Sequence, residues 1–459
     1  MLSLFVLACR AIFGLTVKSS FSQDICKADF TAATTETSWS SSFSDNENGP
    51  LHFKGKPYRD LLKGSIMTNS KKLRLNVTYG LKLIVVILVL ACCGYAHSPV
   101  KSAPKPTRDW TLYPAVIETY SNRDFAAVSD PHGVFDRMYR VLMVGTGFVP
   151  SEGLPRPVWT DDKNLLVYPG SVLIVVGDLI DGGSDSLKVI EFLRALQKDA
   201  RDRGGQVIVT MGNHEAEFLA NWNNNHAEKF RAELTAVGLN PQSVANCQGE
   251  LGQWLCNLPL AVRVNDWFFC HAGNTKGRTI PQLNSDIARS FNDERENGFK
   301  APEITGENSI LTARLDTDKS KKKQILPWFM DGNSTTNPEA LLRRYAKALY
   351  VNHIVQGHKP GKVIFPTAAG SEVTRQKEEM FQAYNGLLFL IDADMSGKKE
   401  DSDSIGAALY VKGWLRQGRE DGGKEIAFVN CPNPNVIKLL WDSTKQEAFK
   451  GVKCTIADR

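Results

Sequence analysis

From residue 109 onward, the chain alternates between two patterns of apolar and polar positions. The runs SVLIVV at 171–176 and QVIVT at 206–210 are continuous and rich in β-branched residues, which is typical of strands buried on both faces. Between them, LKVIEFLRALQKDA at 187–200 repeats its apolar residues at helical spacing and stops before a pair of glycines. Strands and helices in alternation predict an α/β fold.

The same alternation continues on both sides of this segment. The further strands that we expect are 123–128, 261–270, 353–357, 386–392, 405–411 and 425–430. Helices are expected at 134–144 and 340–349, with a helix-rich stretch at 215–245. The segment 274–338 is polar and contains the run KSKKK, so we expect an insertion of helices and loops there.

The first hundred residues follow a different pattern. The Ser/Thr/Asn-rich stretch at 31–50 has too little apolar content to fold by itself. Residues 67–96 then place Lys71, Lys72 and Arg74 before an unbroken apolar run and the small residues of a cleavage site, which is the layout of a secretory signal peptide. We therefore expect residues 1–66 to be a non-native or disordered extension and Met67 to be the start.

Two alternatives for this segment stay open. The run at 83–96 could be retained as a membrane anchor, although it is shorter than the roughly 20 residues of a membrane span. It could also be lipidated, since VLAC at 89–92 resembles a bacterial lipobox. In each case the folded domain, 97–459, is expected to be exported.

The cysteines agree with an oxidising compartment. Five of the nine follow the proposed cleavage site. We expect disulfides Cys247–Cys256 and Cys431–Cys454, and Cys270 as a buried free thiol at the end of a strand. The alternative is that all five are small residues of the core.

Composition changes this picture little. The chain of 459 residues is 42% hydrophobic and 23% charged, which is an ordinary globular balance. Its formal net charge of +5 is spread along the sequence without an arginine-rich arm, so we expect no nucleic-acid partner.

Ligand-type side chains follow five of the predicted strands. They are Asp130, His132, Asp178, Asn213, His271 and His358. In an open α/β sheet, binding crevices lie beyond the carboxyl ends of the strands, so we expect these loops to share one rim. Asp130 and His132 are two residues apart, and an extended backbone would direct both side chains to one side.

Carboxylates, imidazoles and an amide oxygen form a mixed donor set that suits divalent Mn, Fe or Zn. Six ligands are too many for one tetrahedral ion, but they fit two ions about 3.5–4 Å apart with a shared carboxylate. The sequence therefore predicts two divalent metal ions as cofactors.

The order DxH, GDxxD, GNHE, H and GH resembles the calcineurin-like metallophosphoesterases, over about residues 120–395. The segments VVGDLIDGG, MGNHE and LPLAVRVNDWFFCHAG are most similar to the phosphoprotein-phosphatase branch and its Shewanella-like bacterial relatives. The motif GHKP has a single histidine, as in that branch, whereas many phosphodiesterases of the superfamily have GHxH.

This resemblance implies a four-layer α/β/β/α sandwich and a role for each residue. Asp130 and His132 would hold one metal, Asn213, His271 and His358 the other, and Asp178 would bridge them. Metal-activated hydroxide would attack phosphorus, His214 would protonate the leaving oxygen, and Asp181 would orient His214. For Asp181, the alternative is a helix cap.

The chain departs from the branch at two arginines that hold substrate phosphate, because Gly182 and Met211 occupy their positions. Arg314 is the candidate replacement, and Lys359 a weaker one. We predict an exported phosphatase acting on phosphomonoesters, either phosphoproteins or small esters. The alternatives are a phosphodiesterase or nucleotide pyrophosphatase, and a metal-binding module without catalysis.

Overall fold

A computed structural model of the protein describes most of its C-terminal part. The described residues are 106–121, 124–145, 148–151, 156–159, 172–202, 204–294, 297–314, 328, 337–367, 370–397, 404–412, 424–433 and 436–458. The chain divides into two units, Met1–Ala96 and His97–Arg459, and every described residue belongs to the second. The expected extension at 1–66 and signal segment at 67–96 lie outside these residues.

Two β-sheets form the centre of the second unit. The strands of the seven-stranded sheet, in spatial order, are β1 (Val116–Thr119), β7 (Ala261–Val264), β8 (Trp267–Cys270), β9 (His353–Gln356), β13 (Leu388–Leu390), β12 (Met380–Ala383) and β17 (Phe449–Val452). Those of the six-stranded sheet are β16 (Ile437–Asp442), β15 (Ile426–Asn430), β14 (Ala408–Lys412), β2 (Phe125–Val128), β5 (Val172–Val176) and β6 (Gln206–Thr210).

The sheets pack face to face because alternate residues of each strand point to opposite sides. In β5, Ile174 and Val176 pack with Phe269 and other residues of the seven-stranded sheet. Leu173 and Val175 belong to a second apolar cluster, which includes the helices. The continuous apolar runs of the sequence are therefore strands with two buried faces.

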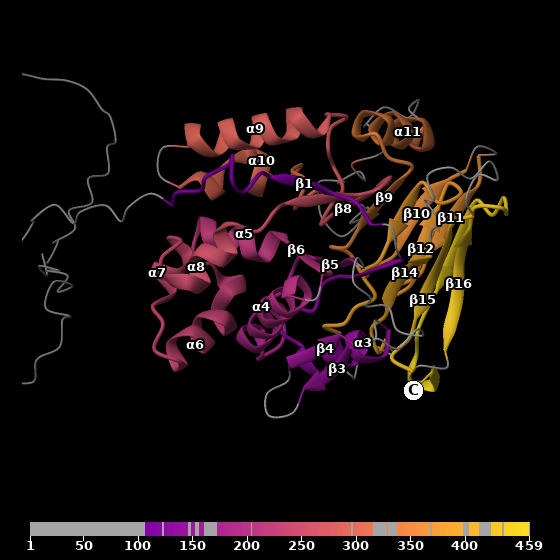
Figure 1. Ribbon diagram of the computed structural model, residues 1–459. Coiled ribbons are helices and arrows are strands. Elements are labelled where there is room, and N and C mark those ends of the chain that lie inside the picture. Colours follow the sequence, from indigo (N-terminus) through magenta and orange to yellow (C-terminus); the bar gives the residue numbers. More distant parts are fainter. Residues whose placement is uncertain are drawn as a thin grey trace, which may run out of the picture. The chain divides into compact units, whose positions relative to one another are not determined.

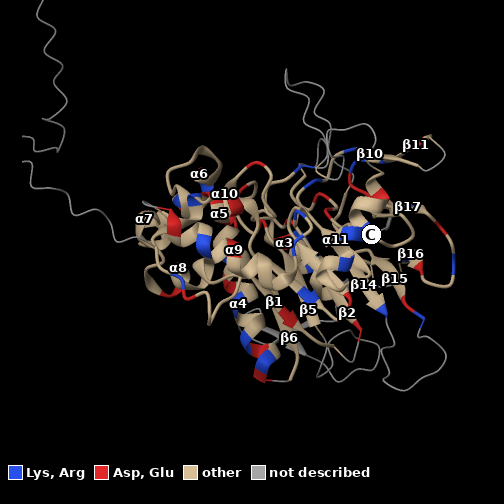
Figure 2. Cartoon of the chain, turned by 90° about the horizontal axis from the view of Figure 1, so that it is seen from above, with Lys and Arg blue, Asp and Glu red and all other residues tan. Residues whose placement is uncertain are grey.

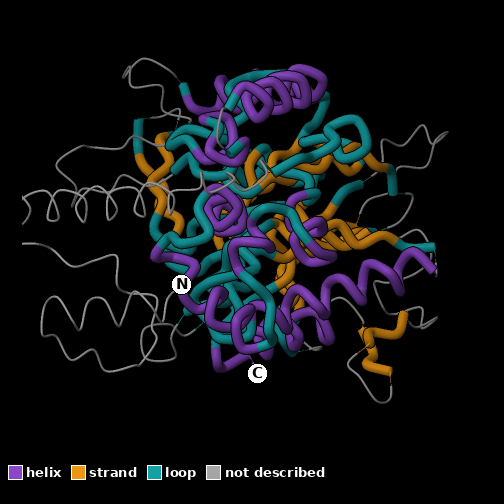
Figure 3. Tube along the Cα trace, turned by 90° about the vertical axis from the view of Figure 1, so that its left-hand side faces the viewer, coloured by secondary structure: helices purple, strands orange, loops and turns teal. Residues whose placement is uncertain are grey.

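Helices cover the outer side of each sheet (Figures 1 and 3). α3 (Phe135–Gly145) and α4 (Ser186–Asp202) lie against the six-stranded sheet, and α9 (Ile280–Asp293) and α11 (Pro338–Leu349) lie over the seven-stranded one. This arrangement confirms the expected four-layer α/β/β/α sandwich. Among the described residues, no helix has the length and apolarity needed to cross a membrane.

Smaller elements complete the domain. They are the hairpins β3 (Phe148–Ser151) with β4 (Arg156–Trp159) and β10 (Val363–Pro366) with β11 (Glu372–Arg375), the helices α5 (Asn213–Ala220), α6 (Glu228–Ala236), α7 (Pro241–Ala245), α8 (Gly249–Cys256) and α10 (Pro302–Thr305), and the 3₁₀ turns η2 (Asn225–Ala227), η3 (Gly298–Lys300) and η4 (Ile456–Asp458). Basic and acidic positions are interspersed along the described helices (Figure 2).

One predicted strand is wrong. The segment 261–270 forms two antiparallel strands, β7 and β8, rather than one. Asn265 adopts a left-handed conformation with φ of +54°, and the chain reverses there. Both predicted disulfides are present, and Cys270 is a buried free cysteine, as expected.

The polar segment 274–338 contributes to the core as well as to loops. Its helix α9 buries Ile280, Leu283, Ile287 and Phe291, which recur at helical spacing. The KSKKK run lies outside the described residues.

Candidate active site

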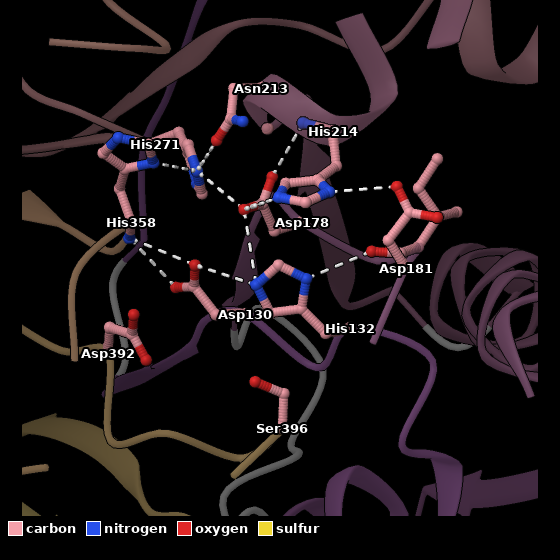
Figure 4. Close-up of polar contacts among 12 residues, drawn as sticks. Asp130, His132, Asp178, Asp181, Asn213, His214, His271, His358, Asp392 and Ser396 are labelled. Carbon is pink, nitrogen blue, oxygen red and sulfur yellow. Dashed lines mark hydrogen bonds and ion pairs between the residues drawn. The ribbon is translucent and has the colours of Figure 1, made fainter. Parts of the chain in front are cut away.

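The six predicted metal ligands converge at one edge of the two sheets (Figure 4). Each follows the carboxyl end of a strand: Asp130 and His132 follow β2, Asp178 follows β5, Asn213 follows β6, His271 follows β8 and His358 follows β9. β2, β5 and β6 are parallel to one another, and β8 is parallel to β9, so these ends meet. Asn213 and His214 open helix α5, whose N-terminus therefore points into the site.

The backbone at these strand ends is turned rather than extended. Asp130 and His132 have φ of 56° and 45°, so the expectation that an extended backbone aligns them is wrong. Asp178, Asp181 and His358 share this left-handed conformation, with φ of 52°, 66° and 71°. Because non-glycine residues rarely adopt it, the concentration of such residues here marks a site that holds its side chains at a cost in backbone energy.

A close approach between two loops explains one of the motif glycines. A Cβ atom on Gly212 would lie 2.1 Å from Oδ1 and 2.2 Å from the backbone nitrogen of Asp178. Any side chain at this position would collide with Asp178, so only glycine fits at the first position of GNHE.

Asp178 lies at the centre of the constellation. Its Oδ2 is 3.2 Å from Nε2 of His271, 3.5 Å from Nε2 of His132 and 3.8 Å from Nε2 of His214. The carboxylate is almost fully buried. One oxygen atom is therefore shared between histidines that come from both sheets.

The hydrogen bonds of His271 show which of its nitrogens faces the centre. Its Nδ1 lies 3.0 Å from the carbonyl oxygen of Val176, so that nitrogen carries the proton of the neutral ring. Nε2 then presents a lone pair to the acceptor atoms Oδ2 of Asp178 and Oδ1 of Asn213, the latter at 3.1 Å. Nδ1 of His358 is also 3.1 Å away. The lone pairs of these acceptor atoms repel one another unless a cation or a proton lies between them.

His132 repeats this arrangement on the other side of Asp178. Its Nδ1 lies 3.1 Å from the carbonyl oxygen of Ile180, which leaves the Nε2 lone pair facing Asp178 and, at 3.9 Å, Oδ1 of Asp130. Asp130 is buried and accepts the backbone N–H of His358 on both oxygens, at 3.1 and 3.2 Å.

The donor set fits two divalent ions. Two groups of possible ligands share Asp178: it joins His271 and His358 in one, and His132 and His214 in the other, where Asp130 rather than His214 is the second expected ligand beside His132. Nδ1 of His358, 3.1 Å from Nε2 of His271, is the ring nitrogen that faces this centre. Histidine nitrogens with carboxylate and amide oxygens suit Mn, Fe or Zn.

His214 differs from the other histidines in its partner. Its Nδ1 lies 3.0 Å from Oδ2 of Asp181, a carboxylate rather than a backbone carbonyl. Its ring packs edge-on against His132 and stacks on His226, with centroids 4.8 and 5.8 Å apart. No motif includes His226, whose exposed ring lies with Nδ1 3.1 Å from Oε2 of Glu217.

The charges of the site shift its pKa values in opposite directions. Burial would raise the pKa of Asp178, but the charges of His271, His214 and His132 hold it well below its usual range. Burial would lower the pKa of His271, but Asp178 and Asp130 raise it to about 10. For Asp130, burial and the charges of Asp392 and Asp178 raise the pKa. The negative charges of Asp178 and Asp130 therefore favour a cation beside His271.

Glu215 is an important residue that motif reading did not assign. Its buried carboxylate accepts the backbone N–H groups of Gly212, Asp178, Leu179 and Ile180, at 2.8 to 3.1 Å. It thereby ties the GDxxD loop to the start of α5. The final letter of GNHE was the signal that could have identified it.

Cationic side chains lie beside the site. The Lys229 ammonium of α6 donates to the carbonyl of Gly182, the position of the first missing arginine. Burial, the charge of His271 and then the charges of Lys359 and Arg314 lower the pKa of His358, so both of these cations lie within electrostatic reach. Met211, at the position of the second missing arginine, is fully buried. Lys229 was missed because it lies far from every motif in sequence.

Comparisons with known proteins agree with this geometry. The family model for calcineurin-like phosphoesterases matches residues 124–361, which include all six predicted ligands. The chain belongs to the calcineurin-like phosphoesterases. It is accordingly a metal-dependent hydrolase of phosphoric esters, in the branch that the motifs indicated.

Among its relatives, Shewanella-like protein phosphatase 1 of Plasmodium berghei (strain Anka) is 29% identical over 279 residues, covering 60% of this chain and 68% of that protein. A symmetrical bis(5'-nucleosyl)-tetraphosphatase of Janthinobacterium sp. (strain Marseille) is 28% identical over 137 residues, covering 30% and 44%. A cold-active protein-tyrosine phosphatase of a psychrophilic Shewanella species is 18% identical, with a TM-score of 0.46 and coverage of 71% and 82%.

Proposed function

We propose that the protein is an exported phosphatase that hydrolyses phosphomonoesters with two divalent metal ions. The observation that carries this proposal is the pair of ligand groups that share Oδ2 of Asp178, with the Nε2 lone pairs of His132 and His271 directed toward it. When bound, two such ions would supply positive charge to the phosphoryl oxygens and lower the pKa of a bound water molecule.

The chain's own residues would supply the proton and the orientation. His214 would carry a proton on Nε2 toward the leaving oxygen, because Asp181 accepts from Nδ1 and stabilises the imidazolium form. Lys229 and Arg314 would orient the phosphate in place of the two missing arginines. Asp130, Asn213 and His358 would complete the metal ligands.

A phosphomonoester is favoured by the single histidine of GHKP and by the cations at the rim. A phosphomonoester dianion carries more charge than a diester and gains more from Lys229 and Arg314. A recess of about 380 Å³ next to His226, lined also by Glu217 and Thr305, offers room for a large leaving alcohol.

Export is supported by the signal-type pattern at 67–96 and by the two disulfides. Disulfides persist in oxidising compartments and are rare in the cytosol. Cleavage after Ala96 would leave the whole sandwich in the mature protein.

A second candidate is a nucleotide pyrophosphatase. The match to the bis(5'-nucleosyl)-tetraphosphatase favours it, although that match covers only 44% of the relative. The two candidates differ in the charge and the size of the group attached to the scissile phosphate.

The deciding experiment compares three substrates at equal metal loading of the full chain: para-nitrophenyl phosphate, bis(para-nitrophenyl) phosphate and diadenosine tetraphosphate. We expect kcat/KM for the monoester to exceed that for the other two by about 100-fold or more, equivalent to about 2.7 kcal/mol. A preference for the tetraphosphate would replace the proposal with the second candidate, and a preference for the bis-ester would indicate a phosphodiesterase.

A further inference from the structure

A second cluster of metal-ligand side chains lies at the opposite ends of the strands that carry His271 and His358. Asp266 precedes β8, His353 begins β9, and Glu425 precedes β15 of the other sheet. One ligand atom from each of the three lies within 4.8 Å of the other two. Strands β8 and β9 therefore have metal-ligand residues at both ends.

His353 is held so that one nitrogen faces this cluster. The residue is only 5% exposed, and its ring stacks on Trp267 with centroids 4.0 Å apart. Its Nδ1 lies 2.6 Å from the carbonyl oxygen of Gly386, so in the neutral ring Nδ1 carries the proton. Nε2 then presents a lone pair to Oε2 of Glu425, 3.3 Å away. A lone pair facing a carboxylate oxygen needs a proton or a metal ion between them.

The two carboxylates are oriented by donors from the protein. Nε1 of Trp267 donates to Oε1 of Glu425 at 3.2 Å, and Nδ2 of Asn352 donates to Oδ2 of Asp266 at 2.6 Å. The other oxygen of Asp266, Oδ1, is buried without a hydrogen-bond partner among the described residues. Asp266 thus has one oxygen held by Asn352 and one without a partner, and Glu425 has one oxygen held by Trp267 and one facing Nε2 of His353. Metal sites have ligands that are oriented by surrounding hydrogen bonds in this way.

The charge balance also favours a cation. Two carboxylates face a single imidazole, and Lys424, the neighbour of Glu425, pairs with Asp442 at 3.1 Å.

We propose that Asp266, His353 and Glu425 form a third divalent-metal site, separate from the catalytic centre, that joins β8 and β9 to β15. One imidazole nitrogen and two carboxylates suit Zn or Mn, with water in the remaining positions. The ion would link the two sheets at the edge opposite the active site. The competing account is a metal-free ion pair between protonated His353 and the carboxylates.

The test measures Zn²⁺ bound to the metal-stripped full chain, by titration calorimetry and by metal analysis after removal of loosely bound ions. Glu425→Gln preserves the size of the side chain and an acceptor for Trp267. Glu447→Gln is the matched control, because this carboxylate is 42% exposed and pairs only with Lys450 in the described contacts. Asp266→Asn is a second variant at the less buried side of the cluster.

We expect wild type and Glu447→Gln to bind one more equivalent of Zn²⁺ than Glu425→Gln and Asp266→Asn, and to gain more in Tm from Zn²⁺. Asp178→Asn, which disrupts the proposed catalytic centre, should still bind that equivalent, so the two proposals can fail separately. Equal stoichiometry and equal Zn²⁺-dependent gain in Tm in wild type, Glu447→Gln, Glu425→Gln and Asp266→Asn would overturn the site in favour of the ion pair. If Glu425→Gln does not fold, Asp266→Asn decides alone.

Discussion

At the scale of single residues, the partner of each histidine Nδ1 separates the proposed roles. His132 and His271 donate Nδ1–H to backbone carbonyls, which fixes the ring and directs Nε2 toward Asp178. His214 donates to the carboxylate of Asp181, which favours the protonated ring. The same residue type is thereby prepared for metal ligation at two positions and for proton donation at a third.

Asp181→Asn tests the proton donor. Burial alone would lower the pKa of His214, but Asp178 and Asp181 raise it to about 9. His214 must be protonated to act as an acid, so loss of the Asp181 charge should lower its pKa and move the alkaline limb of the kcat profile to lower pH. We expect kcat on an alkyl phosphate to fall about 10- to 100-fold.

Para-nitrophenyl phosphate provides the internal comparison for Asp181→Asn, because its leaving group needs little protonation and its kcat should fall less. Asp202→Asn, at an exposed carboxylate of α4, is the control variant. An unchanged pH profile in Asp181→Asn would show that Asp181 does not set the protonation of His214.

Lys229→Gln tests the proposed replacement for the missing arginine. Its ammonium lies at Gly182, so its loss should weaken binding of the phosphate dianion. One charge-assisted hydrogen bond is worth about 1.5–3 kcal/mol, so we expect KM to rise about tenfold or more while kcat changes little. Lys198→Gln, at an exposed lysine of α4, is the control. A KM equal to that of the control would leave phosphate binding to Arg314 and the metals.

At the scale of elements, Glu215 holds two strand-end loops together. Four backbone N–H groups point at its buried carboxylate, and no other described side chain accepts from them. In Glu215→Gln, the amide nitrogen would replace one acceptor and face two of these donors.

We expect Glu215→Gln to lose about 3 kcal/mol or more of unfolding free energy, because buried donors without acceptors cost about 1–3 kcal/mol each. Urea unfolding of the metal-free full chain measures this loss, with Glu228→Gln at the exposed start of α6 as the control. A loss below about 1 kcal/mol would show that the two loops are held by other contacts.

Most elements were predictable because they carry a strong periodic signal. The runs that became β5 and β6 are apolar on both faces, and α4 and α11 repeat their apolar residues at helical spacing. The turn between β7 and β8 could not be predicted. VRVNDWFF is apolar on both sides of Asn265, and only the φ of that residue reveals the turn. Short edge strands such as β1 and β17 also lack a distinct pattern.

At the scale of the whole molecule, the disulfide Cys431–Cys454 links the two sheets near one edge. Cys431 follows β15 of the six-stranded sheet, and Cys454 follows β17 of the seven-stranded sheet. The bond closes a loop of 23 residues, so the double variant Cys431→Ala/Cys454→Ala should lose on the order of 3 kcal/mol of unfolding free energy.

Denaturant unfolding with and without a reducing agent checks this prediction. The reductant should destabilise wild type and leave the double variant nearly unchanged, apart from the smaller effect of Cys247–Cys256, which closes a separation of 9 residues. Equal stability of the two proteins under oxidising conditions would mean that the sheets are held together by their shared core alone.

The candidate site was largely predictable because each ligand belongs to a motif at a strand end. Asp178 and His271 are far apart in sequence, yet the packing of the two sheets brings Oδ2 of Asp178 to 3.2 Å from Nε2 of His271. Residues that support the motifs from elsewhere, such as Lys229 and His226, could not be found in this way. Their positions depend on how α5, η2 and α6 pack, which no local pattern specifies.

The most direct test of the central claim is hydrolysis of para-nitrophenyl phosphate by the metal-stripped full chain, with and without added Mn²⁺, next to Asp178→Asn. The account predicts turnover that requires the metal and falls at least about 1,000-fold in the variant, because one oxygen of Asp178 serves both ligand groups. Folded, metal-loaded wild type without turnover, or Asp178→Asn as active as wild type, would contradict it.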